Sequence, residues 1–185
     1  LYDYAFSPMY YLKSVEMEGV VQINQRAFYN CSELLYASFP DVTAIGTYAF
    51  GNCIRMEEAS FPNVTQISDH AFYNNTRLRQ IDIPKAETIG SYAFNKCTVR
   101  ELELSDITTL DSNAFNSLES FISLTLNTST PLTAAANTFS SMPTVRRVQV
   151  PAGTEADYDA ADGTVNNKWF GWTLEDISHT VSSFT

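Results

Sequence analysis

Positive charge is scarce in this sequence. The chain has 11 lysines and arginines against 21 aspartates and glutamates, so its formal net charge is −10. Nucleic-acid binding usually needs a basic stripe, and docking on an anionic membrane needs a polybasic run; the sequence has neither. No apolar run approaches the roughly 18 residues that a membrane-spanning helix requires. The composition therefore argues against nucleic-acid partners and against membrane insertion.

Histidine, glycine and cysteine are also few. The two histidines and seven glycines form no GxSxG, HExxH or phosphate-binding glycine loop. The three cysteines, Cys31, Cys53 and Cys97, each lie three residues after a phenylalanine and make no CxxC pair. We interpret them as small buried side chains, with a Cys31–Cys53 disulfide between neighbouring coils as the alternative. We therefore expect no enzymatic activity, no cofactor and no metal site.

An internal repeat is what the chain has in abundance. Ala-Phe recurs at 5–6, 27–28, 49–50, 71–72 and 93–94, always 22 residues apart, and again at 114–115. A fixed period of about 20–29 residues is typical of a leucine-rich repeat, in which each coil stacks only on its neighbours. The sequence therefore predicts a repeat solenoid, a right-handed coil of ~22-residue repeats.

Each repeat also carries its own secondary-structure pattern. Apolar and polar residues alternate from Leu12 to Met17 and in the later copies, which indicates β-strands that stack into a parallel concave sheet. Short β-branched pieces such as 42–45 predict a second line of β-bridges on the convex side. The residues before each Ala-Phe predict a turn into a short helical turn, with His70 exposed. Ile81 and Val145 belong to the predicted core columns.

Two parts are expected along the chain. Residues 1–151 form the solenoid, with about seven coils of which the first is incomplete, and residues 152–185 form a C-terminal capping segment. A cap is needed because the open end of a solenoid exposes its apolar core. Trp169 and Trp172 are interpreted as covering the last coil, and a platform for sugar stacking is the alternative.

The repeat motif itself resembles a known family. Val-Thr-x-Ile-x-x-x-Ala-Phe-x-x-Cys-x-x-Leu-x-x-x-x-Phe-Pro, followed from residue 1 to about 151, is similar to the BspA-type (Treponema pallidum-type) bacterial surface leucine-rich repeat. Asn75 and Leu118 depart from it, because cysteine is usual at their position. The resemblance implies a protein that is exported and is extracellular or displayed on the cell surface. It also implies adhesion to a surface or matrix protein of a host or neighbouring cell.

The candidate site is formed by strand residues that point away from the core on the concave sheet, the surface that solenoids use for extended recognition. The candidate residues are Tyr36, Glu58, Gln80, Asp82, Glu101, Glu103 and Thr125. Like charges on adjacent strands destabilise a sheet, so the acidic cluster suggests a basic partner or a bound cation. A solubilising surface neutralised by Arg79 and Arg100 is the alternative.

The sequence as a whole favours a non-catalytic, monomeric binding or adhesion module that recognises a protein through the concave sheet. Two other functions fit the same architecture. One is a structural stalk or spacer that presents another domain, and the other is a carbohydrate-binding module.

Overall fold

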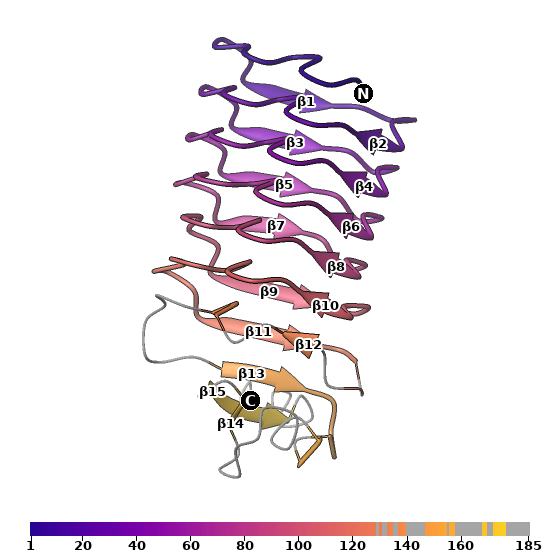
Figure 1. The fold of residues 1–185 in the computed structure, drawn as a ribbon, viewed down its shortest axis with the longest axis vertical. Coiled ribbons are helices and arrows are strands. Elements are labelled where there is room, and N and C mark those ends of the chain that lie inside the picture. Colours follow the sequence, from indigo (N-terminus) through magenta and orange to yellow (C-terminus); the bar gives the residue numbers. More distant parts are fainter. Residues whose placement is uncertain are drawn as a thin grey trace, which may run out of the picture.

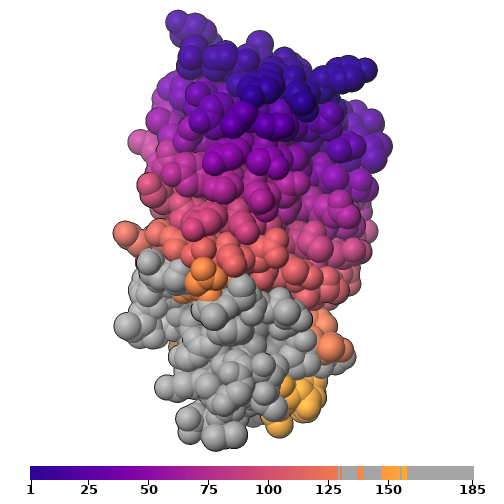
Figure 2. Space-filling model, in the orientation of Figure 1, coloured from indigo at the N-terminus to yellow at the C-terminus, as the bar shows by residue number. Residues whose placement is uncertain are grey.

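The computed structural model of the chain is a solenoid whose coils stack along one axis (Figure 1). It describes residues 1–128, 130, 133–134, 137–139, 147–154, 156–157, 168–169 and 172–176. The space-filling view in Figure 2 shows the successive coils as layers, with each layer lying against the layers before and after it in the sequence. The predicted repeat solenoid is confirmed.

Successive coils contribute one strand of three or four residues and one strand of two residues. The longer strands are β1 (Ser14–Glu16), β3 (Tyr36–Ser38), β5 (Glu58–Ser60), β7 (Gln80–Asp82), β9 (Glu101–Leu104), β11 (Ser123–Leu126) and β13 (Arg147–Val150). The shorter ones are β2 (Gln22–Ile23), β4 (Ala44–Ile45), β6 (Gln66–Ile67), β8 (Thr88–Ile89), β10 (Thr109–Leu110) and β12 (Thr133–Ala134). Beyond them lie β14 (Lys168–Trp169) and β15 (Trp172–Asp176).

The longer and the shorter strands form separate parallel sheets along the stack (Figure 1). Equivalent residues of neighbouring coils pair with each other, as Ser14 does with Tyr36 and Tyr36 with Glu58. The six short strands make one continuous sheet from β2 to β12, which confirms the predicted second line of β-bridges. β15, inside the predicted capping segment, pairs in parallel with β13, and β14 is antiparallel to β15.

The sheet of longer strands is interrupted between β7 and β9. β1, β3, β5 and β7 form one sheet, whereas β9, β11, β13, β15 and β14 form another. The repeat between Phe94 and Phe115 is 21 residues long, and the missing residue falls before β9. The Thr98 amide consequently donates to the Leu78 carbonyl at 3.2 Å, outside the register of the earlier coils. Ile81, predicted as core, is only partly buried at this break.

The turns after the short strands differ from the helical turn that we predicted. In the turn of residues 24–31, the amides of Ala27, Tyr29 and Cys31 donate to carbonyls three residues back. The amides of Arg26, Phe28 and Asn30 donate instead to Thr47, Ala49 and Gly51 of the next coil. A helix directs every amide along its own axis, so a helix here could not bond to the next coil.

This alternation needs two residues with positive φ in each turn. They occupy the positions of Arg26 (φ 54°) and Asn30 (φ 61°) in successive coils. A helix cannot continue through such residues. The turns therefore form a third line of hydrogen bonds between coils, beside the two sheets.

A stack of phenylalanine rings fills the core. The rings of Phe6, Phe28, Phe50, Phe72, Phe94, Phe115 and Phe139 lie nearly parallel, with centroids 4.9–5.7 Å apart. Phe39 and Phe61 form a second, shorter stack that meets the first at about 60°. Aromatic pairs of this kind contribute about 0.5–1.5 kcal/mol each beyond their burial. The predicted core columns are otherwise buried, apart from Leu12, Met17 and Val20 in the first coil, while Val145 lies outside the described residues.

The three cysteines occupy one position in the repeat and are buried in the core. Cys31, Cys53 and Cys97 are buried free thiols, so the expectation of small buried side chains is confirmed. Each thiol donates to the carbonyl of a phenylalanine 25 residues earlier, as Cys97 does to Phe72 at 3.1 Å. Burial raises the pKa of the Cys97 thiol to about 12.

Asn75 occupies the same column without such a partner. It is fully buried, and within the described part of the chain its Oδ1 and Nδ2 atoms have no hydrogen-bond partner. An unsatisfied buried polar group costs about 1–3 kcal/mol.

We therefore expect Asn75→Cys to stabilise the protein by about 1–3 kcal/mol, because the amide is removed and the thiol can donate to the Phe50 carbonyl. Urea unfolding monitored by circular dichroism would measure the change. Cys53→Asn is the matched control and should lower stability by a similar amount. An unchanged or lower unfolding midpoint for Asn75→Cys would contradict the assigned environment of Asn75.

A ladder of asparagines crosses the turns. Asn30, Asn52 and Asn74 all have φ near 60°. The Asn52 amide donates to Asn30 Oδ1 at 3.0 Å, and the Asn74 amide donates to Asn52 Oδ1 at 2.9 Å. Asparagine tolerates the left-handed region better than other residues with a Cβ. Each asparagine therefore supports its own turn and the neighbouring coils.

The middle residue of this ladder allows its two roles to be separated. Asn52→Gly removes the side-chain hydrogen bonds but keeps the positive φ accessible, whereas Asn52→Ala also adds about 1–2 kcal/mol of backbone strain. We expect Asn52→Ala to be less stable than Asn52→Gly by about 1 kcal/mol in urea unfolding. The opposite order, which is usual in helices, would rule out a strained left-handed backbone at this position.

Candidate functional site

The seven predicted residues all lie on the outward side of the longer strands, which we call the long-strand face. Burial alternates along these strands, so that in β9 Leu102 and Leu104 are buried while Glu101 and Glu103 are exposed. Glu58, Gln80 and Asp82 are exposed as well, and Tyr36 and Thr125 are half-buried. The burial pattern thus shows the candidate residues pointing away from the core, as predicted.

The strand register arranges these residues in two columns along the stack. One column, with one residue per coil, reads Ser14, Tyr36, Glu58, Gln80, Glu101, Ser123 and Arg147, and the other reads Glu16, Ser38, Ser60, Asp82, Glu103, Thr125 and Gln149. In the first column Gln80 separates Glu58 from Glu101. In the second, Asp82 and Glu103 are the neighbouring acids, and they lie on either side of the break between β7 and β9.

The break therefore divides the candidate site into two acidic halves. Stacked strands stand about 4.8 Å apart, and like charges directly opposite each other destabilise a sheet. Asp82 and Glu103 would have faced each other across a continuous pair of strands. The structure brings Tyr36, Glu58, Gln80 and Asp82 together on one sheet, and it brings Glu101, Glu103 and Thr125 together on the other.

Neutral groups are the hydrogen-bond partners of the candidate site. Ser60 donates to Asp82 at 3.2 Å, and Asn127 donates to Glu103 Oε1 at 2.8 Å. Among the described residues one ion pair is found, between Arg55 and Glu33 at 2.6 Å, and both residues lie outside the longer strands. Arg79 and Arg100, the expected counter-charges, make no ion pair with the long-strand face. The acidic groups thus remain available to a partner.

A second surface feature, made of exposed and half-buried side chains, was not predicted from the sequence. Tyr4, Arg26, Tyr48, His70 and Tyr92 occupy one turn position in successive coils and have φ of 54–57°. The Arg26 guanidinium lies 5.7 Å from the Tyr4 ring and 5.3 Å from the Tyr48 ring. Tyr48 stacks on His70 at 4.6 Å, and His70 stacks on Tyr92 at 5.1 Å. We call this row the aromatic ladder.

His70 is therefore half-buried between two tyrosines, and the prediction that it would be exposed is wrong. Burial lowers the pKa of His70, while the charge of Asp69 acts in the opposite direction. A neutral imidazole at neutral pH suits this sandwich of rings. The recurrence of tyrosine at the His70 position was the signal in the sequence that could have revealed the stack.

Several kinds of site are missing from the described part of the chain. No group of three or more His, Cys, Asp or Glu side chains is placed to hold a metal ion there. The same residues include no helix with the length and apolarity needed to cross a bilayer. What the described surface offers is therefore rows of polar and aromatic groups at the spacing of the coils.

Comparison with solved structures supports the same architecture. A leucine-rich repeat protein of T. pallidum matches with a TM-score of 0.56 and 21% identity, covering 71% of this chain and 66% of that protein. A Bacteroides ovatus leucine-rich repeat protein matches with a TM-score of 0.63 and 19% identity, over 88% and 43% of the two chains. The pneumococcal vaccine antigen PcpA matches with a TM-score of 0.64 and 20% identity, covering 88% of this chain and 41% of that protein.

These likenesses concern the fold, because all three identities are low. The chain spans about two thirds of the T. pallidum protein and less than half of the other two. The comparison with curated proteins gave no match. The family described as "BspA type Leucine rich repeat region" matches in six copies, over residues 1–122 and 43–160. The chain therefore belongs to the BspA-type leucine-rich repeat family.

Proposed function

We propose that this chain is a non-catalytic binding and adhesion module, presented outside the cell or on its surface, whose long-strand face docks a protein. The family is consistent with a repeat module for binding or adhesion. The observation that carries the proposal is the set of exposed acidic residues on this face, Glu58, Asp82, Glu101 and Glu103, none of which has an ion-pair partner among the described residues.

Charge complementarity gives the partner its chemistry. Four carboxylates on one face create a negative potential that speeds encounter with a basic surface. Tyr36, half-buried at one end of the acidic row, supplies the kind of aromatic contact that often dominates interface energy. A partner with a basic patch, on a host or neighbouring cell or in its matrix, meets both requirements. A monomeric module with one such face is sufficient for this role.

A structural stalk is the competing function, and charge variants separate the two. The triple variant Glu58→Gln, Glu101→Gln and Glu103→Gln removes three charges from the long-strand face. The matched control, Glu87→Gln, Asp106→Asn and Glu119→Gln, removes the same charge from exposed residues outside this face. Both variants therefore have the same net charge, and any difference between them reports position.

We expect the face variant to bind at least about tenfold more weakly than the native chain, and the control variant to bind within about twofold. Beads coated with each chain would be applied to epithelial cell layers and to surfaces coated with collagen, laminin or fibronectin. Binding of the native chain should also weaken between low and high salt. If no surface retains the native beads, or if both variants behave as the native chain does, the long-strand face is not the docking surface.

A further inference from the structure

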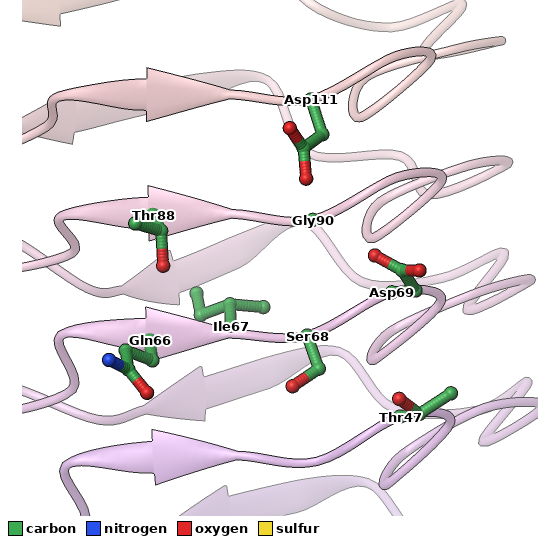
Figure 3. A pocket seen from close by; sticks show the side chains of 8 residues that line it. All are labelled: Thr47, Gln66, Ile67, Ser68, Asp69, Thr88, Gly90 and Asp111. Carbon is green, nitrogen blue, oxygen red and sulfur yellow. The ribbon is translucent and has the colours of Figure 1, made fainter.

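A polar hollow lies among the short strands, on the other side of the solenoid from the long-strand face. It has a volume of about 340 Å³ and is lined by Thr47, Gln66, Ile67, Ser68, Asp69, Thr88, Gly90 and Asp111. Figure 3 shows these residues on four successive coils, with Gly90 between Ser68 and Asp111. The long strands pass behind them in the same view.

Gly90 lies in the hollow and cannot easily be replaced. The position holds Ser68 in the coil before and Asp111 in the coil after, and in Figure 3 the Asp111 side chain extends from its coil toward Gly90. A Cβ atom on Gly90 would lie 2.5 Å from Asp69 Oδ1 and 2.7 Å from the Asp69 backbone nitrogen. A side chain there would require the neighbouring coil to shift. The gap between Ser68 and Asp111 is therefore built into the backbone packing.

Five of the six polar side chains around the hollow are not used by the fold. Within the described part of the chain, Thr47, Gln66, Ser68, Thr88 and Asp111 make no side-chain hydrogen bond to another protein group. Threonines nearby behave differently, since Thr43, Thr65 and Thr108 each donate to a carbonyl of the preceding coil.

We propose that this hollow binds a neutral saccharide. Ligand pockets of about 300–1,000 Å³ are usually lined by apolar side chains, whereas Ile67 is the one apolar side chain in this lining. The hydroxyls and the Gln66 amide need acceptors as well as donors, while the carboxylates of Asp69 and Asp111 accept only. A sugar hydroxyl both donates and accepts, so a polyol satisfies the whole set, and a sugar without acidic groups avoids repulsion by the two carboxylates.

A lysine or arginine side chain matches the hydrogen-bonding groups of the hollow less well than a sugar does. It could pair with Asp69 and Asp111, but it has donors alone and would leave the Gln66 amide without an acceptor. One oxygen of Asp69 is also occupied, because Oδ1 accepts the Ser91 amide at 2.9 Å. The lining thus favours a ligand with many hydroxyl groups over a single positive charge.

The aromatic ladder lies next to the hollow along the chain. Thr47 and Asp69, which line it, are followed directly by Tyr48 and His70, at the start of turns that project from its edge (Figure 3). Tyr92 ends the stacked row and is exposed. Its ring covers His70 on one side, and the next residue of the row is the smaller Asn113. The exposed part of the Tyr92 ring is the surface against which the apolar face of a sugar ring would stack.

The proposal is tested by nuclear magnetic resonance with three neutral probes, maltohexaose, cellohexaose and N-acetylchitohexaose. We expect at least one of them to shift the amide signals of residues 66–69, 88–90 and 111. The double variant Gln66→Ala and Asp111→Ala should raise the dissociation constant at least tenfold. Both side chains are exposed, so the fold should survive, and the spectrum of the free variant checks this.

Two further variants sharpen the result. Gln22→Ala is the matched control, because Gln22 holds the position of Gln66 on β2, two coils away, and it should bind within twofold of the native chain. Tyr92→Asn should weaken binding severalfold if the ring stacks on the sugar. Asparagine fits there because Asn113 has nearly the same φ, 59° against 57°.

Three outcomes would overturn the proposal. The first is that none of the hexaoses shifts the amide signals of the hollow. The second is that the double variant binds a hexaose as tightly as the native chain does. The third is that a hexa-arginine peptide shifts these signals while the sugars do not, which would assign the hollow to basic peptides. The long-strand face takes no part in any of these measurements, so failure here is separate from failure of the proposed docking of a protein.

Discussion

The distance between coils is the constraint on which the rest of this structure depends. Three lines of backbone hydrogen bonds, two in the sheets and one in the turns, hold each coil at the spacing of paired strands, which is about 4.8 Å. No coil encloses a core of its own, so every residue meets the equivalent residues above and below it. That is why phenylalanine rings stack at 4.9–5.7 Å and why three asparagines can bond in a row.

The same spacing decides which side chains a column can hold. Apolar rings and amides gain from close contact with an identical neighbour, whereas carboxylates do not. The two acidic columns on the long-strand face follow this rule: Gln80 separates Glu58 from Glu101, and the sheet is interrupted where Asp82 and Glu103 would otherwise meet. Ile81, which lies next to the shortened repeat that shifts the register, is only partly buried. Charge on this face and local weakness of the sheet therefore coincide at one place in the stack.

The sequence predicted those features that repeat at a fixed position. The alternation around Val15, the Val42 to Ile45 pieces and the Ala-Phe pairs led to both lines of strands, to the core columns and to the outward orientation of Glu58, Asp82, Glu101 and Glu103. The turns were beyond such reasoning, because their two residues with positive φ are held by bonds to the next coil and local propensity favours a helix. The stacking of His70 was missed because the variety of residues at its position suggested an exposed site, although tyrosine recurs there.

Recognition in such a fold must come from the departures from regularity. Where the same residue recurs in neighbouring coils, as in the phenylalanine column and in the three asparagines, the side chains contact one another and leave little for a partner to bind. The long-strand face and the hollow at Gly90 have the opposite property, because a carboxylate alternates with an amide in one and a missing side chain interrupts a polar row in the other. Each leaves donors or acceptors that the fold itself does not use. Since the two lie on opposite sides of the coil, a protein on one and a saccharide on the other could be held by the same few coils, so that a short segment of solenoid is enough for two different contacts.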